Sequence, residues 1–224
     1  MDLKSIDRIY IISLPNSERR LDVKHELNKN FMWFNWYDGI ENKQDGAEGL
    51  KQTFKKLFTE CLEKGMGNVM IFEDDAMFTE GSSYEDIAAV LKELPESYHL
   101  CKFGANLLAP VSKVSENINR ILMSYALHAC LYSKKGMELI IKEIDNYKEP
   151  IDVIMAKRIE PLGESYVSNK MIVTQRPTKS NIFVYDPAKH KNLTFYNQET
   201  GVMDWDSFMQ KQWKLAKQHF KETV

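Results

Sequence analysis

The chain has 224 residues, of which 43% are hydrophobic, and this is enough apolar material for a folded core and excludes a disordered or fibrous protein. Its 30 Lys and Arg residues nearly balance its 32 Asp and Glu residues, and the net charge of -2 argues against a nucleic-acid-binding surface. The longest apolar runs, 9–14 and 69–72, are far shorter than the roughly 20 residues that cross a bilayer, so no transmembrane segment is predicted.

Short apolar strands alternate with amphipathic helices in the first half of the chain. After Leu50, bulky residues recur every three or four positions, which places them on one face of a helix that ends at Gly65 and Gly67. The following run is apolar and partly β-branched, as in a fully buried strand. In chain order, the sequence predicts a strand at 8–14, a helix at 17–30, a strand at 31–37, a helix at 50–62 and a strand at 68–72.

The same alternation continues in the second half. Ser83 stands where a helix N-cap is expected, with acidic residues in the turn after it. The further elements predicted are a helix at 83–94, extended segments at 98–103 and 118–132, a helix at 137–144, a last strand at 171–174 and a terminal helix from 206. This order predicts an α/β domain with a largely parallel sheet at 1–182, and an extension at 183–224 whose amphipathic helix packs on that domain.

The N-terminus and the cysteines indicate the cellular compartment. Residues 1–8 are charged and lead directly into a strand, so we expect the mature protein to begin at Met1 without a secretory leader. Cys61, Cys101 and Cys130 are odd in number, widely spaced and surrounded by apolar residues. They are expected to be free thiols in a reducing compartment, which points to a cytoplasmic protein.

Three consecutive acids, Glu73, Asp74 and Asp75, follow the buried strand at 68–72. In open α/β sheets, ligands bind at the carboxyl ends of the strands. Between Lys64 and Lys92 there is no Lys, Arg or His to offset the repulsion among these carboxylates. A divalent cation would do so, and oxygen-only ligands favour Mg²⁺ or Mn²⁺, which can neutralise the diphosphate of a phosphate-activated substrate. The alternatives are that the acids splay into solvent or reach a distant arginine.

Several motifs, in this order, resemble the family 25 glycosyltransferases of lipopolysaccharide and collagen glycosylation. They are residues 6–20 (IDRIYIISLPNSERR), a Phe-rich strand that ends in Asp38-Gly39-Ile40, residues 69–76 (VMIFEDDA), residues 124–136 (SYALHACLYSKKG), Pro150-Ile151-Asp152 and residues 175–181 (QRPTKSN). The resemblance covers about 6–182. It implies a GT-A-like nucleotide-diphospho-sugar transferase fold that uses Mn²⁺ or Mg²⁺ and a UDP-sugar. The sugar would pass, with inversion, to a hydroxyl of a saccharide, glycolipid or protein acceptor.

Carried onto this sequence, the resemblance implies a role for each matching residue. Asp75 would be the direct metal ligand, with Glu73 or Asp74 toward the metal, its bound water or the ribose. Ser13, Leu14 and Pro15 would line the nucleotide, and Asp38 and Gly39 would lie beside the uridine and ribose. Arg20 would either approach the diphosphate or brace the loop. From their position in a loop after the last strand, Gln175 and Ser180 are expected to close over the diphosphate. Arg19 is interpreted as a solvated helix charge.

Catalysis by inversion needs a base near the acceptor hydroxyl, and Asp152 is the candidate, although a helix N-cap is an equally natural role. His128 and His190 are candidates for a third metal ligand, against the alternatives of a structural and an exposed loop histidine. The family usually carries Ser-His upstream of the acids, where this chain has Thr53-Phe54. Thr53 keeps a hydroxyl, but Phe54 cannot replace an imidazole.

Two other functions stay open. The first is a catalytically silent module that binds nucleotide sugars, which the loss of the histidine at Phe54 favours. The second is a metal-dependent phosphohydrolase, which the scattered positions of the five histidines disfavour. The terminal helix carries four lysines, so peripheral contact with an anionic membrane is an alternative to simple packing. They are Lys211, Lys214, Lys217 and Lys221.

Overall fold

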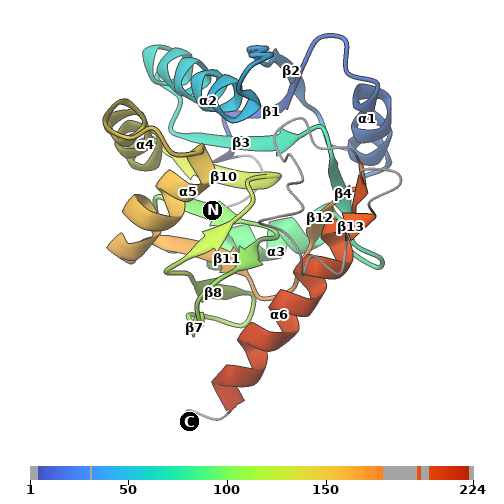
Figure 1. Ribbon diagram of the computed structural model, residues 1–224. Coiled ribbons are helices and arrows are strands. Elements are labelled where there is room, and N and C mark those ends of the chain that lie inside the picture. The colour runs from blue at the N-terminus through green and yellow to red at the C-terminus, as the bar shows by residue number, and fades with distance from the viewer. Residues whose placement is uncertain (1–4, 31, 179–195, 198–201, 222–224) are drawn as a thin grey trace.

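The computed structural model describes residues 5–30, 32–178, 196–197 and 202–221, and its centre is a sheet of eight strands (Figure 1). From one edge to the other, these strands are β2 (Asn35–Asp38), β1 (Arg8–Ser13), β3 (Asn68–Glu73), β10 (Ala129–Ser133), β5 (Leu100–Lys102), β11 (Ser165–Ser168), β8 (Ile118–Arg120) and β7 (Ser112–Lys113). Only β10 and β8 run against the common direction of the other six. The sheet is therefore mostly parallel in strand direction.

Helices cover both faces of this sheet because its strands alternate apolar side chains to either side. On β3, Met70 and Phe72 face one core cluster, and Val69 and Ile71 face the other. The first cluster includes residues of α1 (Arg19–Lys29) and α3 (Tyr84–Glu93). The second includes residues of α2 (Gly46–Glu63), α4 (Lys134–Asn146), α5 (Ile151–Ile154) and α6 (Trp205–Lys221). In Figure 1, α2, α4 and α5 lie together on the left, and α1 stands apart on the right.

The predicted α/β class, with a mostly parallel sheet flanked by helices, is confirmed. Each of the helices predicted from periodicity is present, and Ser83 caps α3 in a capping box with Asp86. The strand predicted at 31–37 is shorter and begins at Asn35. The extended segment at 118–132 is broken into β8, β9 (Ser124–Tyr125) and β10, with Ala126 at a positive φ of 71° between the last two.

The remaining elements lie beside or beyond the main sheet. Short pairs are formed by β4 (Ala76–Phe78) with β12 (Val173–Gln175), by β6 (Asn106–Leu107) with β9, and by β13 (Tyr196–Asn197) with β14 (Val202–Met203). A π-helical segment, η2 (Met155–Ile159), and a 3-10 turn, η3 (Glu160–Leu162), continue α5. The predicted last strand is thus present as β12, but it pairs outside the main sheet.

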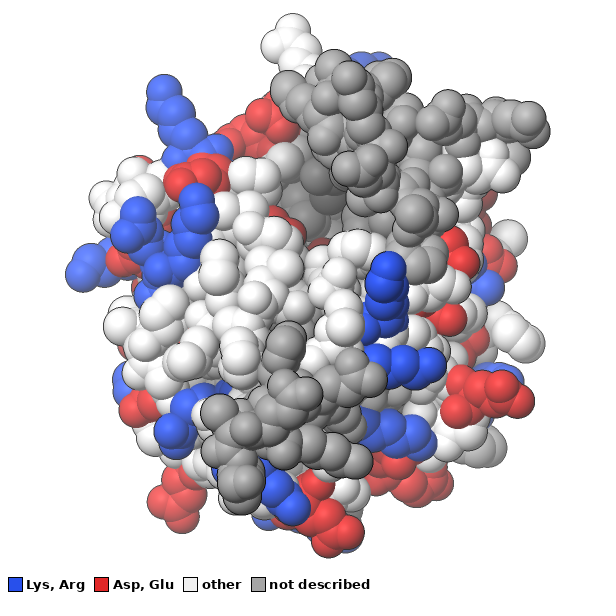
Figure 2. Space-filling model, turned by 60° about the horizontal axis from the view of Figure 1, so that its bottom comes forward, with Lys and Arg blue, Asp and Glu red and all other residues white. Residues whose placement is uncertain are grey.

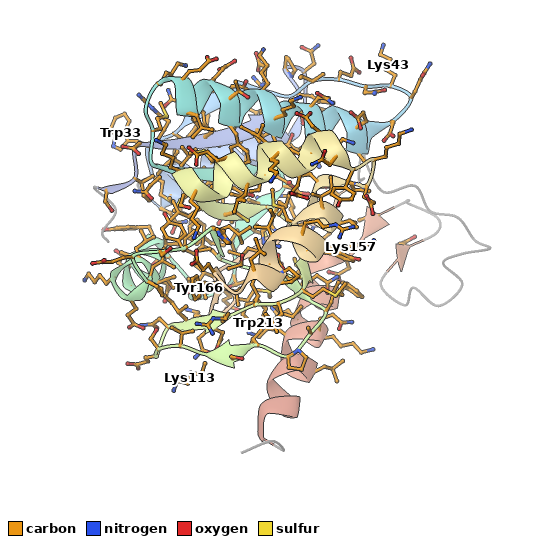
Figure 3. The ribbon with its side chains drawn as sticks, turned by 90° about the vertical axis from the view of Figure 1, so that its left-hand side faces the viewer. Trp33, Lys43, Lys113, Lys157, Tyr166 and Trp213 are labelled. Atoms are coloured by element: carbon orange, nitrogen blue, oxygen red, sulfur yellow. The ribbon has the colours of Figure 1, made fainter. Side chains whose placement is uncertain are left out.

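The C-terminal helix α6 is seated on the domain through its apolar face. Met209 is fully buried and Trp213 is nearly so, both in the core cluster of α2 and α4. Figure 3 shows Trp213 directed into the body of the molecule, whereas Trp33 lies at its periphery. Within the described part of the chain, no helix combines the length and the apolar character needed to span a bilayer.

The three cysteines lie in the core, as the sequence predicts, and the surface charges are mixed on the face shown in Figure 2. Cys61, Cys101 and Cys130 are all buried free thiols. On the face shown in Figure 2, Lys and Arg side chains lie among Asp and Glu side chains rather than apart from them. The described residues of that face therefore carry no field of a single sign.

Candidate functional site

The carboxyl ends of the three neighbouring strands β2, β1 and β3 form the candidate site. Strand β1 pairs with both β2 and β3. The connection from β1 to β2 contains α1, which packs on one face of the sheet, and the connection from β2 to β3 contains α2, which packs on the opposite face. Such a reversal of winding opens a crevice at the ends of the strands. In the register, Ser13 is opposite Asp38, and Ile12 is opposite Glu73. The sheet therefore brings together the predicted residues Ser13, Asp38 and Glu73.

Asp74 is buried, and both of its carboxylate oxygens are bound by protein groups. The Ser13 hydroxyl donates to Asp74 Oδ2 at 2.6 Å, and Arg19 Nη2 lies 2.8 Å from Asp74 Oδ1. Arg19 comes from the first turn of α1, which directly follows β1. Asp74 is therefore a structural acceptor that ties β1 and α1 to the acidic turn.

Asp75 is also buried, but one of its oxygens has no partner. Gln175 Nε2 donates to Asp75 Oδ2 at 3.1 Å, and Arg19 Nη1 lies 3.8 Å from the same oxygen. Asp75 Oδ1 is inaccessible and accepts no hydrogen bond within the described structure. Burial raises the pKa of Asp75 to about 6, although the Arg19 charge acts in the opposite direction. Two of the predicted site residues, Asp75 and Gln175, are thus in contact, and Asp75 Oδ1 is a buried acceptor without a partner among the described residues.

Glu73, the last residue of β3, is affected by charges from the acidic turn and from the predicted base. Burial raises the pKa of Glu73 well above its usual range, and the charges of Asp75, Asp74 and Asp152 add to that shift. Asp152 is half-buried in the first turn of α5, so it lies in the helix and is not the N-cap, a position that Pro150 occupies. The charge of the candidate base therefore acts on Glu73, the first of the three acids.

Arg20 braces the loop after β1. Its guanidinium donates to the carbonyl oxygens of Ser13 and Leu14, both at 3.0 Å, and is paired with Asp38. It also lies over the Trp36 ring, 4.7 Å from the centroid. Of the two roles predicted for Arg20, the structure shows the bracing one.

Arg19, interpreted from the sequence as a solvated helix charge, is the basic residue that reaches the acids, and that interpretation is wrong. The available signal was the absence of a local basic partner for the acidic run, which left a divalent cation, exposure to solvent or a distant arginine as the alternatives. The structure shows the arginine, at Asp74 and Asp75. This lack of a local basic residue could not indicate whether Arg19 or Arg20 reaches the acids, because the two are adjacent at the start of a helix.

An open cavity of about 560 Å³ lies at the β1–α1 turn, with Arg19 in its wall. Its size is in the range of sites that hold small ligands and cofactors. The residues that line it come from the β1–α1 turn, α1 and two further loops: Leu14, Pro15, Asn16, Ser17, Glu18, Arg19, Asp22, Glu41 and Thr178. Two of the predicted nucleotide contacts, Leu14 and Pro15, are thus at the cavity, with Arg19 between it and the acids. Gly39 adjoins the same turn, since its N–H donates to the Ser13 carbonyl oxygen at 2.9 Å.

Of the two histidine candidates, His128 lies among the described residues, and it does not complete a metal site. His128 is fully buried, its Nε2 lies 2.9 Å from the Val173 carbonyl oxygen, and burial lowers its pKa to about 4. Of the two interpretations of His128, a metal ligand and a structural histidine, the structure supports the second. Ser180 and His190 lie outside the described residues. Among the described residues, no three His, Cys, Asp or Glu side chains are grouped so that they could hold a metal ion by themselves.

Thr53 and Phe54, which stand where the family usually has Ser-His, are part of the scaffold. The Thr53 hydroxyl donates to the Gly49 carbonyl oxygen and accepts from the Ile40 N–H, both at 2.8 Å. Phe54 is fully buried and packs edge-on against Phe58 and Tyr132. Neither side chain is available to a ligand.

Replacing Asp75 by asparagine is expected to stabilise the metal-free protein by about 2–3 kcal/mol at pH 8. The folded state holds the Asp75 proton more tightly than the unfolded state, whose pKa is near 3.8, because burial raises the folded pKa to about 6. Ionised Asp75 therefore opposes folding in full above pH 6, and this cost is lost as the pH falls toward 4. Urea unfolding of both proteins in EDTA at pH 4 and pH 8 measures the difference, and a difference independent of pH would contradict it.

No protein-family model and no curated protein matches the chain. Among solved structures, A197 from STIV is 12% identical, with a TM-score of 0.43 over 75% of this chain and 83% of that one. A glycosyltransferase involved in the glycosylation of the major capsid of PBCV-1 is 8% identical, with a TM-score of 0.47 over 71% and 79%. A mannose-1-phosphate geranyltransferase from Thermus thermophilus is 11% identical, with a TM-score of 0.38 over 71% and 58%. At these values, the superpositions say nothing about what this chain binds.

Proposed function

We propose that the chain is a metal-dependent glycosyltransferase that moves a sugar from a UDP-sugar to a hydroxyl of a saccharide, glycolipid or protein acceptor, with inversion. The observation that carries the proposal is Asp75 Oδ1, a buried carboxylate oxygen without a partner within the described structure. It lies in the turn at the carboxyl end of β3, and Arg19 links this turn to the wall of a cavity large enough for a nucleotide. A buried acceptor of this kind calls for a cation or a donor from a ligand.

The donor set suits Mn²⁺ or Mg²⁺. Asp75 would hold the ion with help from Glu73, the last residue of β3, on which the charges of Asp75 and Asp74 act. Asp74 is not available, because Ser13 and Arg19 bind both of its oxygens. So few protein ligands leave positions for water and diphosphate oxygens, which Mg²⁺-like ions prefer to keep. The bound ion would neutralise charge on the departing diphosphate.

The nucleotide would occupy the cavity along Leu14 and Pro15. Arg20 fixes the shape of this turn by binding two of its carbonyl oxygens, and it holds Asp38 at the end of β2. The Asp38 side chain is 65% exposed, so it can still accept a hydrogen bond from a ribose hydroxyl. Gln175, and Ser180 beyond the described residues, would close over the diphosphate.

Asp152 would act as the base. In the proposed step, the acceptor oxygen attacks the anomeric carbon, its proton passes to Asp152, and the bond to the diphosphate breaks with its electron pair leaving on UDP. Asp152 is suited to this because it lies in the first turn of α5 and its charge acts on Glu73, the first of the three acids.

The experiment that tests the proposal is thermal unfolding with UDP, UDP-glucose and UDP-galactose, each with and without Mn²⁺. At a ligand concentration of 100 times its Kd, we expect about 2.7 kcal/mol of stabilisation, which is a rise of roughly 5–10 °C in Tm for a chain of this size. The rise should require Mn²⁺. No metal-dependent rise with any of the three nucleotides would refute the proposal.

A silent nucleotide-sugar-binding module is the second candidate, because a buried phenylalanine, Phe54, stands where the family usually has a histidine. Such a module would show the same Mn²⁺-dependent rise in Tm. It would release neither a transfer product nor free sugar when incubated with UDP-sugars and a panel of acceptors.

A further inference from the structure

Arg19 is placed between the acidic turn and the nucleotide cavity. Its guanidinium contacts Asp74 through Nη2 at 2.8 Å and approaches Asp75 through Nη1 at 3.8 Å. The side chain is 22% exposed and contributes to the cavity wall. One side of Arg19 therefore faces the carboxylates, and it borders the space proposed for the nucleotide.

The guanidinium of Arg19 neutralises part of the negative charge that a divalent cation at Asp75 would neutralise. No Lys, Arg or His lies between Lys64 and Lys92, so the acidic run depends on positive charge from elsewhere, and Arg19 supplies it. A cation bound to Asp75 would lie within a few ångströms of this guanidinium, where like charges repel strongly. Arg19 and the cation therefore oppose each other at Asp75.

The same guanidinium is well suited to a diphosphate. Arginine presents a planar fork of donors that matches phosphate oxygens, and such charge-assisted contacts are among the strongest hydrogen bonds. If Nη1 turns from Asp75 toward the cavity, the Nη2 contact with Asp74 can be kept. This rotation would relieve the repulsion from the cation and add positive charge beside the diphosphate.

We infer that Arg19 couples the two ligands of the site: it competes with the divalent cation for Asp75 in the free protein and binds the donor's diphosphate once the cation is present. The inference rests on the proposed function. It makes Arg19 a ligand-binding residue that weakens binding of the cation alone and strengthens binding of the nucleotide to the cation-loaded protein. These two effects have opposite signs, which distinguishes them from general damage to the site.

The test is Arg19→Gln, with Mn²⁺ binding followed by the EPR signal of free Mn²⁺ and UDP binding followed by calorimetry at saturating Mn²⁺. We expect Mn²⁺ alone to bind about tenfold tighter to the variant, as for the loss of one nearby like charge, and UDP to bind about tenfold weaker. Arg120→Gln is the matched control. It removes the same charge from β8, which β3, β10, β5 and β11 separate from β1, and should leave both affinities within twofold.

Arg19→Lys keeps the test decisive if the glutamine variant does not fold. The ammonium retains the charge but not the fork, so Mn²⁺ affinity should stay within about twofold of the wild type while UDP binds several-fold weaker. Suppose that the wild type binds both Mn²⁺ and UDP. If the affinities of the Arg19 variant for the two ligands fall together, or if neither affinity changes, the inference is overturned and the proposed function stands. If the wild type binds neither ligand, the proposed function fails and the inference fails with it.

Discussion

Asp75→Asn is expected to lower Mn²⁺-dependent turnover of the sugar donor by about 10²–10³-fold, comparable to the loss of one charge-stabilising group in other active sites. The change removes the charge at the buried oxygen that lacks a partner but preserves the size of the side chain. Its amide oxygen can still accept from Gln175, so the turn should keep its shape. Initial rates of donor hydrolysis and transfer across a Mn²⁺ series measure the effect.

Asp145→Asn is the matched control for this prediction. Asp145 lies on α4, is 55% exposed and pairs with Lys55, so its loss should not affect turnover. If Asp75→Asn kept its activity within a few-fold and its dependence on Mn²⁺ were unchanged, Asp75 would not be the metal ligand. The two asparagine variants differ only in where one carboxylate is lost, which makes the comparison specific to the site.

Asp152→Asn is expected to lower kcat by about 10²–10⁴-fold and to leave the affinity for UDP and Mn²⁺ unchanged. Asparagine cannot accept the proton of the acceptor hydroxyl, yet it is close in size and can still accept from the Val153 N–H as Asp152 does at 2.8 Å. Single-turnover transfer rates measure the chemical step, and calorimetry with UDP and Mn²⁺ measures binding.

Glu149→Gln serves as the control for Asp152, because Glu149 is partly exposed, three residues earlier, and pairs with Lys157 at 3.5 Å. A normal rate for Asp152→Asn would exclude Asp152 as the base. A matched fall in UDP affinity would instead assign it to donor binding, which the proposed step does not predict.

The strand-end chemistry was predictable from the sequence because it depends on local pattern. A short apolar run followed by three acids predicts a buried strand with the acids at its end, and in the structure Glu73 ends β3 opposite Ile12. The cap at Ser83 followed in the same way from a polar residue and acids spaced for one helical turn.

Contacts made across the fold were not predictable, because they depend on helix rotation and on exact ends. Arg19 and Arg20 are adjacent, and about 100° of rotation between them sends one to the acids and the other to the β1 turn. The apolar face of α1 is buried at only Val23 and Leu27, so its pattern of apolar residues could not define its rotation. The sequence pattern allowed Asp152 to be either an N-cap or a residue of the helix, and the choice depends on where α5 begins, which is Ile151.

The two outer strands of the sheet bear on how the molecule behaves in concentrated solution. Strand β2 has four residues and β7 has two, so another chain could gain few main-chain hydrogen bonds at either border. Lys113 on β7 is exposed and lies at the outside of the molecule in Figure 3, and an approaching strand would have to cover its charge. Short, charged borders of this kind discourage strand-by-strand aggregation. The sheet is therefore protected against fibril growth by its outermost strands.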